Sequence, residues 1–176
     1  NKVYGSRLHA DFPESLPFFK EVALYWIDEL EIDGWRLDQS FQLPSESWRE
    51  IEDAVYELCE QRKKAGKKWG TLGYMVGEVW EKSEGIARKN YGTDENPGLI
   101  SGFDFPVRYK ITQVLAVEEK GFGQQPTAVL KEGLLTHYKY PKRAIPNLML
   151  TNHDLVRFGD LIQRAGLPGP EDETYW

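Results

Sequence analysis

Three acidic residues stand in comparable places along the chain. Asp38, Glu78 and Asp154 each lie at or just beyond the end of a short apolar segment that resembles a strand. Carboxylates can serve as nucleophiles, general acids and general bases. Taken one at a time, an acid after a strand is about as often a helix N-cap or an ion-pair partner. It is the set of three that predicts a functional site.

The elements that position these residues follow from apolar periodicity and from turn residues. Strands are predicted at residues 32–37, 74–79, 102–105 and 144–150, and helices at 15–30, 48–66, 107–118, 127–135 and 155–165. Ser47 and Glu50 resemble a capping box at the start of the second helix. Residues 83–100 form a polar connection with room for a short helix. Alternating helices and strands favour an α/β fold with a parallel sheet, either open and doubly wound or part of a (β/α)8 barrel.

The carboxyl ends of parallel strands meet at one edge of a sheet, and barrel enzymes place their chemistry there. We therefore expect the three carboxylates to converge. Arg36 stands two residues before Asp38, so its side chain shares the same strand face. A cation in that position favours an ionised Asp38.

Three motifs around these acids resemble the conserved regions of the α-amylase family, glycoside hydrolase family 13. They are GWRLD at 34–38, GEVW at 77–80, and NHD at 152–154 followed by Arg157. They occur in the order of the family's second, third and fourth regions. The resemblance implies that the chain covers about strands 4 to 7 of a TIM-type (β/α)8 barrel and that residues 1–176 are part of one catalytic domain.

The resemblance also implies roles. Asp38 would be the nucleophile, Glu78 the general acid and base, and Asp154 the carboxylate that binds the distorted sugar of the transition state. The substrate would be an α-glucan or oligosaccharide, cleaved with retention through a covalent glycosyl-enzyme intermediate. Arg36, His153, Asn152 and Trp80 are the expected substrate-binding residues, although Asn152 is also suited to shaping the turn and Trp80 to the core.

Phe41 and Gln42 occupy the place where many starch-active members have a Lys-His pair, which leaves the linkage specificity open. Two alternatives share the motifs: a transglycosylase or isomerase of the same family, and a non-catalytic sugar-binding or scaffold piece. An unrelated nucleotide-binding protein is disfavoured because the chain lacks a Gly-rich loop between a strand and a helix.

The amino-acid composition limits the kinds of partner that the chain is expected to bind. The net charge is −6, and the one dense basic run, at 62–68, is typical of a solvated helix end, so no nucleic-acid partner is expected. The single cysteine, Cys59, excludes an internal disulfide and is expected in the core. No apolar run approaches the roughly 20 residues of a membrane helix, so no membrane partner is expected.

The length of 176 residues falls short of the roughly 250 that a (β/α)8 barrel needs. We therefore expect a segment of a larger enzyme, with little activity of its own and with open sheet edges that favour self-association. No cofactor is expected within it, whereas the family's usual calcium site would belong to regions of a full-length protein that this chain does not contain. The sequence does not indicate a cellular location.

Overall fold

The computed structural model describes residues 15–117 and 123–166. Four parallel strands form one sheet in the order β1-β2-β3-β4, which is also their order along the chain. They are β1 (Gly34–Leu37), β2 (Tyr74–Gly77), β3 (Ser101–Phe103) and β4 (Ile145–Asn147). An open doubly wound sheet reverses its strand order at a switch point, whereas a barrel does not. The observed order is that of consecutive barrel strands.

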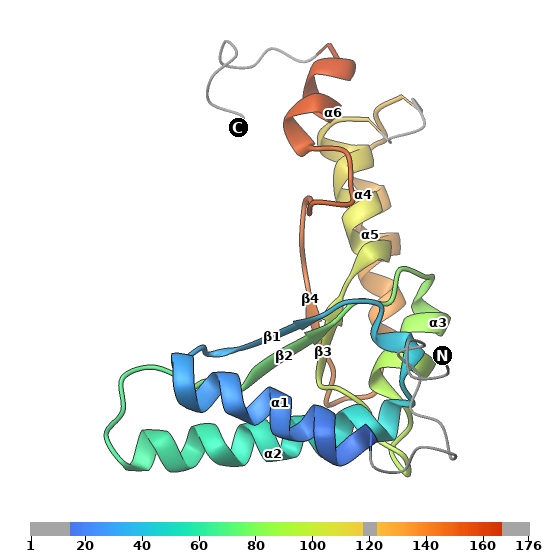
Figure 1. The fold of residues 1–176 in the computed structure, drawn as a ribbon. Helices are drawn as coiled ribbons and strands as arrows, with labels where there is room; N and C mark the ends of the chain where they lie inside the picture. Colours follow the sequence, from blue (N-terminus) through green and yellow to red (C-terminus); the bar gives the residue numbers. More distant parts are fainter. Residues whose placement is uncertain (1–14, 118–122, 167–176) are drawn as a thin grey trace, which may run out of the picture.

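The helices lie between the strands and form two arms (Figure 1). In one arm α1 (Ser15–Leu30) packs along α2 (Ser45–Lys64) beside β1 and β2. In the other, α4 (Phe105–Leu115) packs along α5 (Ala128–Leu135), with α6 (Phe158–Arg164) near its far end. Shorter helical segments complete the connections: η2 (Ser40–Gln42), α3 (Ser83–Ile86), the π-helix η3 (Ala87–Tyr91) and η4 (Thr136–Lys139).

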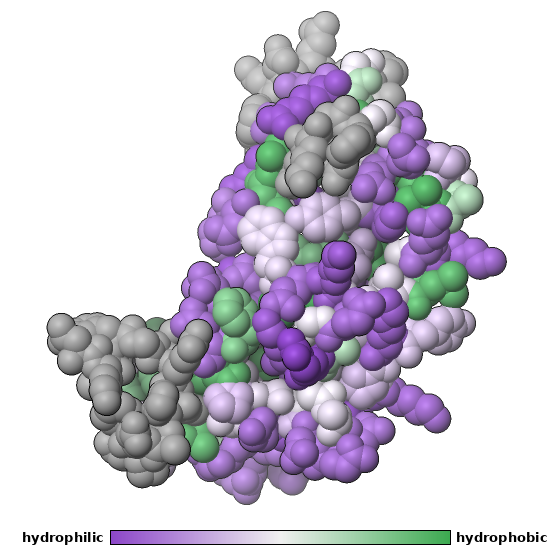
Figure 2. Space-filling view, turned by 90° about the vertical axis from the view of Figure 1, so that its right-hand side faces the viewer, coloured by the Kyte–Doolittle hydropathy of each residue, from purple (hydrophilic) through white to green (hydrophobic). Residues whose placement is uncertain are grey.

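The main hydrophobic core joins the first arm to the sheet. It consists of Ala23, Ile27, Ile51, Val55, Cys59, Met75 and Leu99. Cys59 is 1% exposed, which confirms its predicted place in the core. The side of the molecule that carries α3 and α5 is mostly hydrophilic, with separated apolar patches (Figure 2).

Some predicted boundaries were wrong. The capping box is absent, because α2 begins at Ser45 after Pro44 and Ser47 lies inside its first turn. The helix predicted from 107 begins at Phe105, because the Asp104 side chain accepts a hydrogen bond from the Val107 N–H and so caps it. The last strand was predicted to run to residue 150 and ends at Asn147, and α6 begins at Phe158 rather than at 155.

Candidate active site

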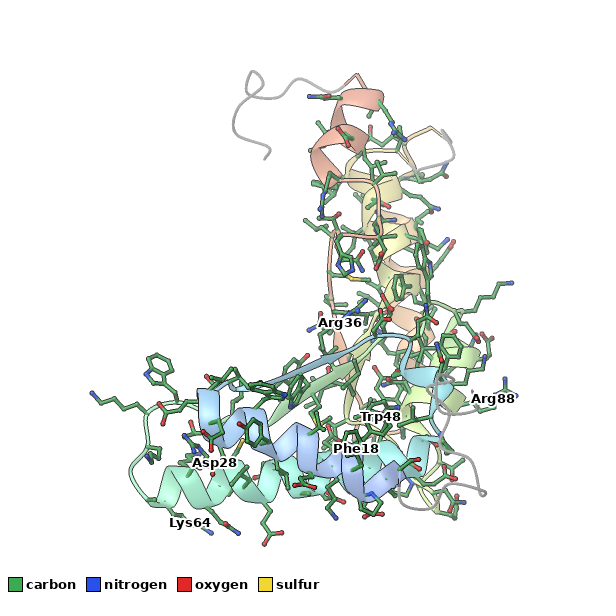
Figure 3. The ribbon with its side chains drawn as sticks, viewed as in Figure 1. Phe18, Asp28, Arg36, Trp48, Lys64 and Arg88 are labelled. Atoms are coloured by element: carbon green, nitrogen blue, oxygen red, sulfur yellow. The ribbon has the colours of Figure 1, made fainter. Side chains whose placement is uncertain are left out.

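Arg36, labelled in Figure 3, lies within 4 Å of all three predicted carboxylates. Its Nη1 donates to Asp38 Oδ1 at 2.6 Å, and its Nη2 donates to Glu78 Oε1 at 2.6 Å. The same Nη2 lies 3.6 Å from Asp154 Oδ2. Partial burial alone lowers the pKa of Arg36, but its hydrogen bond to Asp38 and the charges of Glu78 and Asp38 raise the pKa overall. The guanidinium is therefore a fixed positive charge between three acids from distant parts of the chain.

The environments of the three acids differ in their access to solvent. The side chain of Glu78 is 7% exposed, whereas those of Asp38 and Asp154 are 68% and 41% exposed. The arrangement thus combines one enclosed carboxyl group with two that a ligand can approach. A retaining glycosidase needs two carboxyl groups in different environments, about 5 Å apart. Asp38 and Glu78 accept hydrogen bonds from the two terminal nitrogens of one guanidinium, which holds their carboxyl groups near each other.

Glu78 is held by the backbone as well as by Arg36. Its N–H donates to Leu37 O at 2.9 Å, extending the β1–β2 ladder by one residue. Its own carbonyl accepts from the Ser40 N–H at 3.0 Å and from the Ser40 hydroxyl at 3.2 Å. Gln39 adopts a left-handed conformation, with φ of 43°, and its N–H lies 3.2 Å from Glu78 Oε2. The strained turn after Asp38 therefore orients the carboxyl group of Glu78.

Gly77 makes the close packing behind Glu78 possible. A Cβ on Gly77 would lie 2.0 Å from Asn90 Oδ1 and 2.7 Å from the Ser40 hydroxyl. Asn90, from the π-helix η3, also covers Gly102 and donates to Ser101 O at 3.1 Å. The side chain of Asn90 thus fills the space that two missing side chains leave over β2 and β3. Asn90 gave no signal in the sequence, since a lone Asn in a polar connection is ordinary.

The segment that carries Asp154 is tethered by a buried arginine. Arg108, in α4, is 0% exposed, and its Nε donates to Leu150 O at 3.0 Å. Its Nη2 lies 3.5 Å from Val156 O, so these two contacts, to Leu150 and Val156, flank Asp154 in sequence. Arg108 was not predicted as a functional residue. The available signal was a cation on the apolar face of a predicted helix, where charged residues are rarely buried without partners.

The expected sugar-binding residues Asn152 and His153 both contact Asp154 in the structure. Asn152 Oδ1 accepts the Asp154 N–H at 2.9 Å, and Arg157 Nη1 donates to Asn152 O at 2.7 Å. These contacts agree with the predicted role of Asn152 in shaping the turn, and its predicted sugar contact stays a prediction. His153 is exposed, and its Nε2 lies 3.2 Å from Asp154 Oδ2. It remains available to a ligand.

Trp80 lies beyond Glu78 with one face covered. Its ring stacks on Phe105 at a centroid distance of 5.2 Å and an angle of 6°. Its Nε1 donates to the Tyr109 hydroxyl at 2.8 Å, and the residue is 46% exposed. Trp80 is thus partly buried, with its ring packed against Phe105 and 46% of the residue exposed.

Other features of the described residues do not contribute to this site. A groove of about 570 Å³ lies between α1 and α2 and contains none of the three carboxylates. We assign the site from the convergence of charges, because that groove offers no comparable chemistry. Within residues 15–117 and 123–166 no cluster of three or more His, Cys, Asp or Glu side chains is placed to bind a metal ion. No described helix is long and apolar enough to cross a membrane.

Comparison with known proteins identifies the family. Residues 9–168 match the family model described as "Alpha amylase, catalytic domain". A cyclomaltodextrinase from Thermoanaerobacter pseudethanolicus is 30% identical over 146 residues, which are 83% of this chain and 22% of that protein. The chain thus spans about a fifth of this curated relative.

Solved structures agree. A variant of AmyP in complex with maltotriose is 47% identical, with a TM-score of 0.82 over 94% of this chain and 34% of AmyP. A cyclic maltosyl-maltose hydrolase from Arthrobacter globiformis is 25% identical, with a TM-score of 0.58 over 90% of this chain and 30% of that protein. The chain belongs to the α-amylase family of glycoside hydrolases.

Proposed function

We propose that this chain is part of the catalytic barrel of a retaining glycosidase that cleaves α-glucosidic linkages in starch-like oligosaccharides and polysaccharides. The observation that supports it most directly is the contact of Asp38, Glu78 and Asp154 with one guanidinium, that of Arg36. The names of the relatives give the substrate class: one is a cyclomaltodextrinase, and AmyP has been solved with maltose and with maltotriose.

The first chemical step forms a covalent ester. The Asp38 carboxylate attacks the anomeric carbon while the bond from that carbon to the leaving oxygen breaks. Glu78 gives its proton to the leaving oxygen, which departs as a sugar hydroxyl. Asp38 suits the attack because it is exposed and because Arg36 Nη1 fixes the orientation of its carboxylate.

The second step releases the sugar. Glu78, now a carboxylate, takes a proton from water, and the water oxygen attacks the anomeric carbon as the Asp38 ester breaks. Glu78 suits both steps because two hydrogen bonds, from Arg36 Nη2 and from the Gln39 N–H, hold its enclosed carboxyl group in place. Asp154 would bind sugar hydroxyls and stabilise positive charge on the ring, since it lies beside the same guanidinium and His153.

Azide rescue distinguishes the two roles in the full-length protein. Asp38→Gly opens the face that the nucleophile occupied, so added azide should attack an activated aryl α-glucoside there and give a β-glycosyl azide. Glu78→Ala still forms the Asp38 ester, so azide should displace it and give an α-glycosyl azide. Glu57→Gln, which changes an exposed acid on α2, is the control and should keep full activity.

The configuration of the azide products decides the assignment. Exchanged configurations would reverse the roles of Asp38 and Glu78. Full activity of either variant without azide would refute the proposed site.

A further inference from the structure

A buried carboxylate lies where β3 ends and α4 begins. The side chain of Asp104 is 0% exposed, and its two oxygens have different partners. Oδ1 accepts the Val107 N–H at 3.1 Å, which caps α4, and Oδ2 contacts Nε2 of His137 in η4. Because an ionised carboxylate only accepts hydrogen bonds, the hydrogen of this second contact comes from His137. We call Asp104 and His137 the Asp104–His137 pair.

The pair joins two segments that are distant in the sequence. A buried carboxylate is costly unless donors compensate it, because it has lost its contact with water. His137 supplies one of the two donors from a position 33 residues further along the chain. The ring of His137 also stacks on Tyr140, at a centroid distance of 5.5 Å, and Tyr140 is only 9% exposed. The pair therefore holds the start of α4 against η4, next to a buried ring.

The start of α4 supports the segment that carries Glu78. Phe105, the residue after Asp104, is 0% exposed, and its ring stacks on that of Trp80 at 5.2 Å and an angle of 6°. Trp80 is two residues beyond Glu78 in the chain. An unbroken series of contacts thus joins the Asp104–His137 pair to the backbone that presents the Glu78 carboxyl group.

A separate connection from α4 reaches a different acid. Arg108, one turn further along α4, donates to Leu150 O at 3.0 Å and so holds the segment of Asp154. That hydrogen bond does not involve His137, so it stays when His137 is replaced. In the proposed mechanism Asp154 acts on the sugar ring, whereas Glu78 gives a proton to the leaving oxygen. The two connections should therefore affect different parts of the reaction.

We propose that Asp104 and His137 are positioning residues for the general acid. This inference rests on the proposed function and adds to it two residues that act without touching the substrate. The pair keeps Phe105 against Trp80, and Trp80 fixes the direction of the chain on which Glu78 lies. A general acid must be aligned with the oxygen that it protonates to within a fraction of an ångström, so movement at the start of α4 reaches the chemistry.

The test compares two substrates that differ in their need for a proton. In the full-length protein, kcat/KM is measured on maltotriose and on α-maltosyl fluoride, because a departing fluoride needs little protonation. His137→Leu should lower kcat/KM on maltotriose by about 10-fold and change it little on the fluoride. His137→Gln, whose amide nitrogen can replace Nε2 as the donor to Asp104, should restore most of the loss.

A second variant tests the ring that transmits the effect. Phe105→Leu keeps an apolar side chain but removes the stacking on Trp80, so it should reproduce the selective loss. Tyr138→Ser is the matched control, because Tyr138 follows His137 in η4 and is 86% exposed, and it should leave both kcat/KM values unchanged. A loss of folded protein lowers both values by the same factor, so their ratio still decides when a variant is less stable.

The outcomes separate the two proposals. Equal losses on both substrates, or no loss on maltotriose, would overturn the positioning role and leave the catalytic assignment intact. A wild-type protein that cleaves neither substrate would refute the proposed function.

The link from the pair to Trp80 is tested without activity. In protein labelled with fluorotryptophan, the ¹⁹F signal of Trp80 is identified by its loss in Trp80→Phe. This signal should shift in His137→Leu and stay in place in Tyr138→Ser, because only His137 holds the start of α4. An unchanged Trp80 signal in His137→Leu would overturn the positioning role whatever the activity of the protein.

Discussion

Glu52 should make the stability of the protein depend on pH. This residue of α2 has a side chain that is only 6% exposed. Its oxygens accept the Ile100 N–H, at 3.1 Å to Oε2, and lie 2.9 Å from Arg49 Nη1. Burial raises the pKa of Glu52 from 4.5 to about 7, although the charge of Arg49 and the hydrogen bond from Ile100 partly offset it.

The sign follows from proton binding. The folded protein holds the Glu52 proton more tightly than the unfolded chain does, so the free energy of unfolding falls as the pH rises from about 4.5 to about 7. The rise in pKa corresponds to about 3 kcal/mol at most. Below pH 4.5 the stabilising contribution is fully present, and above pH 7 it is lost.

Glu52→Gln removes the titration and keeps an acceptor for the Ile100 N–H. The assay is urea unfolding of the wild type, Glu52→Gln and the control Glu57→Gln from pH 4.5 to 8. The free energy of unfolding of Glu52→Gln minus that of the wild type should increase by about 3 kcal/mol across this range. In a ¹³C titration, the carboxyl signal that is lost in Glu52→Gln should have a midpoint near 7. A difference in stability that does not change with pH would refute the reasoning.

Three further predictions follow from the site. Gly77→Ala should lower the free energy of unfolding by at least about 2 kcal/mol and remove most of the activity, because its Cβ would meet Asn90 and displace Glu78. The control Gly123→Ala, with no atom within 4 Å of the added Cβ, should change neither the free energy of unfolding nor the activity. Arg108→Met should lower kcat at least about 10-fold on all substrates by releasing the Asp154 segment; a wild-type kcat would contradict the tether. The isolated 176 residues should self-associate, because apolar side chains such as Ile145 and Leu148 are more than half exposed. They should also show little activity on maltooligosaccharides. Their mass in solution and an activity assay test this, and a monomer with ordinary enzyme rates would contradict it.

Local patterns in the sequence predicted the sheet and the places of the three acids. Arg36 and Asp38 share a strand face through simple alternation. Asp38 and Glu78 directly follow β1 and β2, whereas Asp154 lies seven residues beyond the end of β4. The same patterns predicted a last strand that was too long, because Leu148 and Leu150 are apolar but lie beyond the end of β4. The Leu150 carbonyl bonds instead to Arg108, 42 residues earlier in the chain.

The residues that sequence reasoning missed act through such distant contacts. Asn90 fills space over two glycines, and Arg108 holds a segment that begins beyond α5. Asn90 belongs to no periodic pattern or motif, and Arg108 stands out only as a cation on the apolar face of α4. Their importance depends on which elements become neighbours in three dimensions, and a single sequence does not contain that information in local form.

The shared contact of Arg36 also sets the order in which function returns after unfolding. Arg36 is 42 residues from Glu78 and 118 residues from Asp154 along the chain. Contacts between residues so far apart form late, because the entropy of closing the intervening chain must be paid before they contribute. The α1–α2 pair, by contrast, depends on nearby segments. In a refolding experiment, helical circular dichroism should therefore recover before the ability to bind an oligosaccharide, and the interval between them measures how long the segment carrying Asp154 takes to reach Arg36.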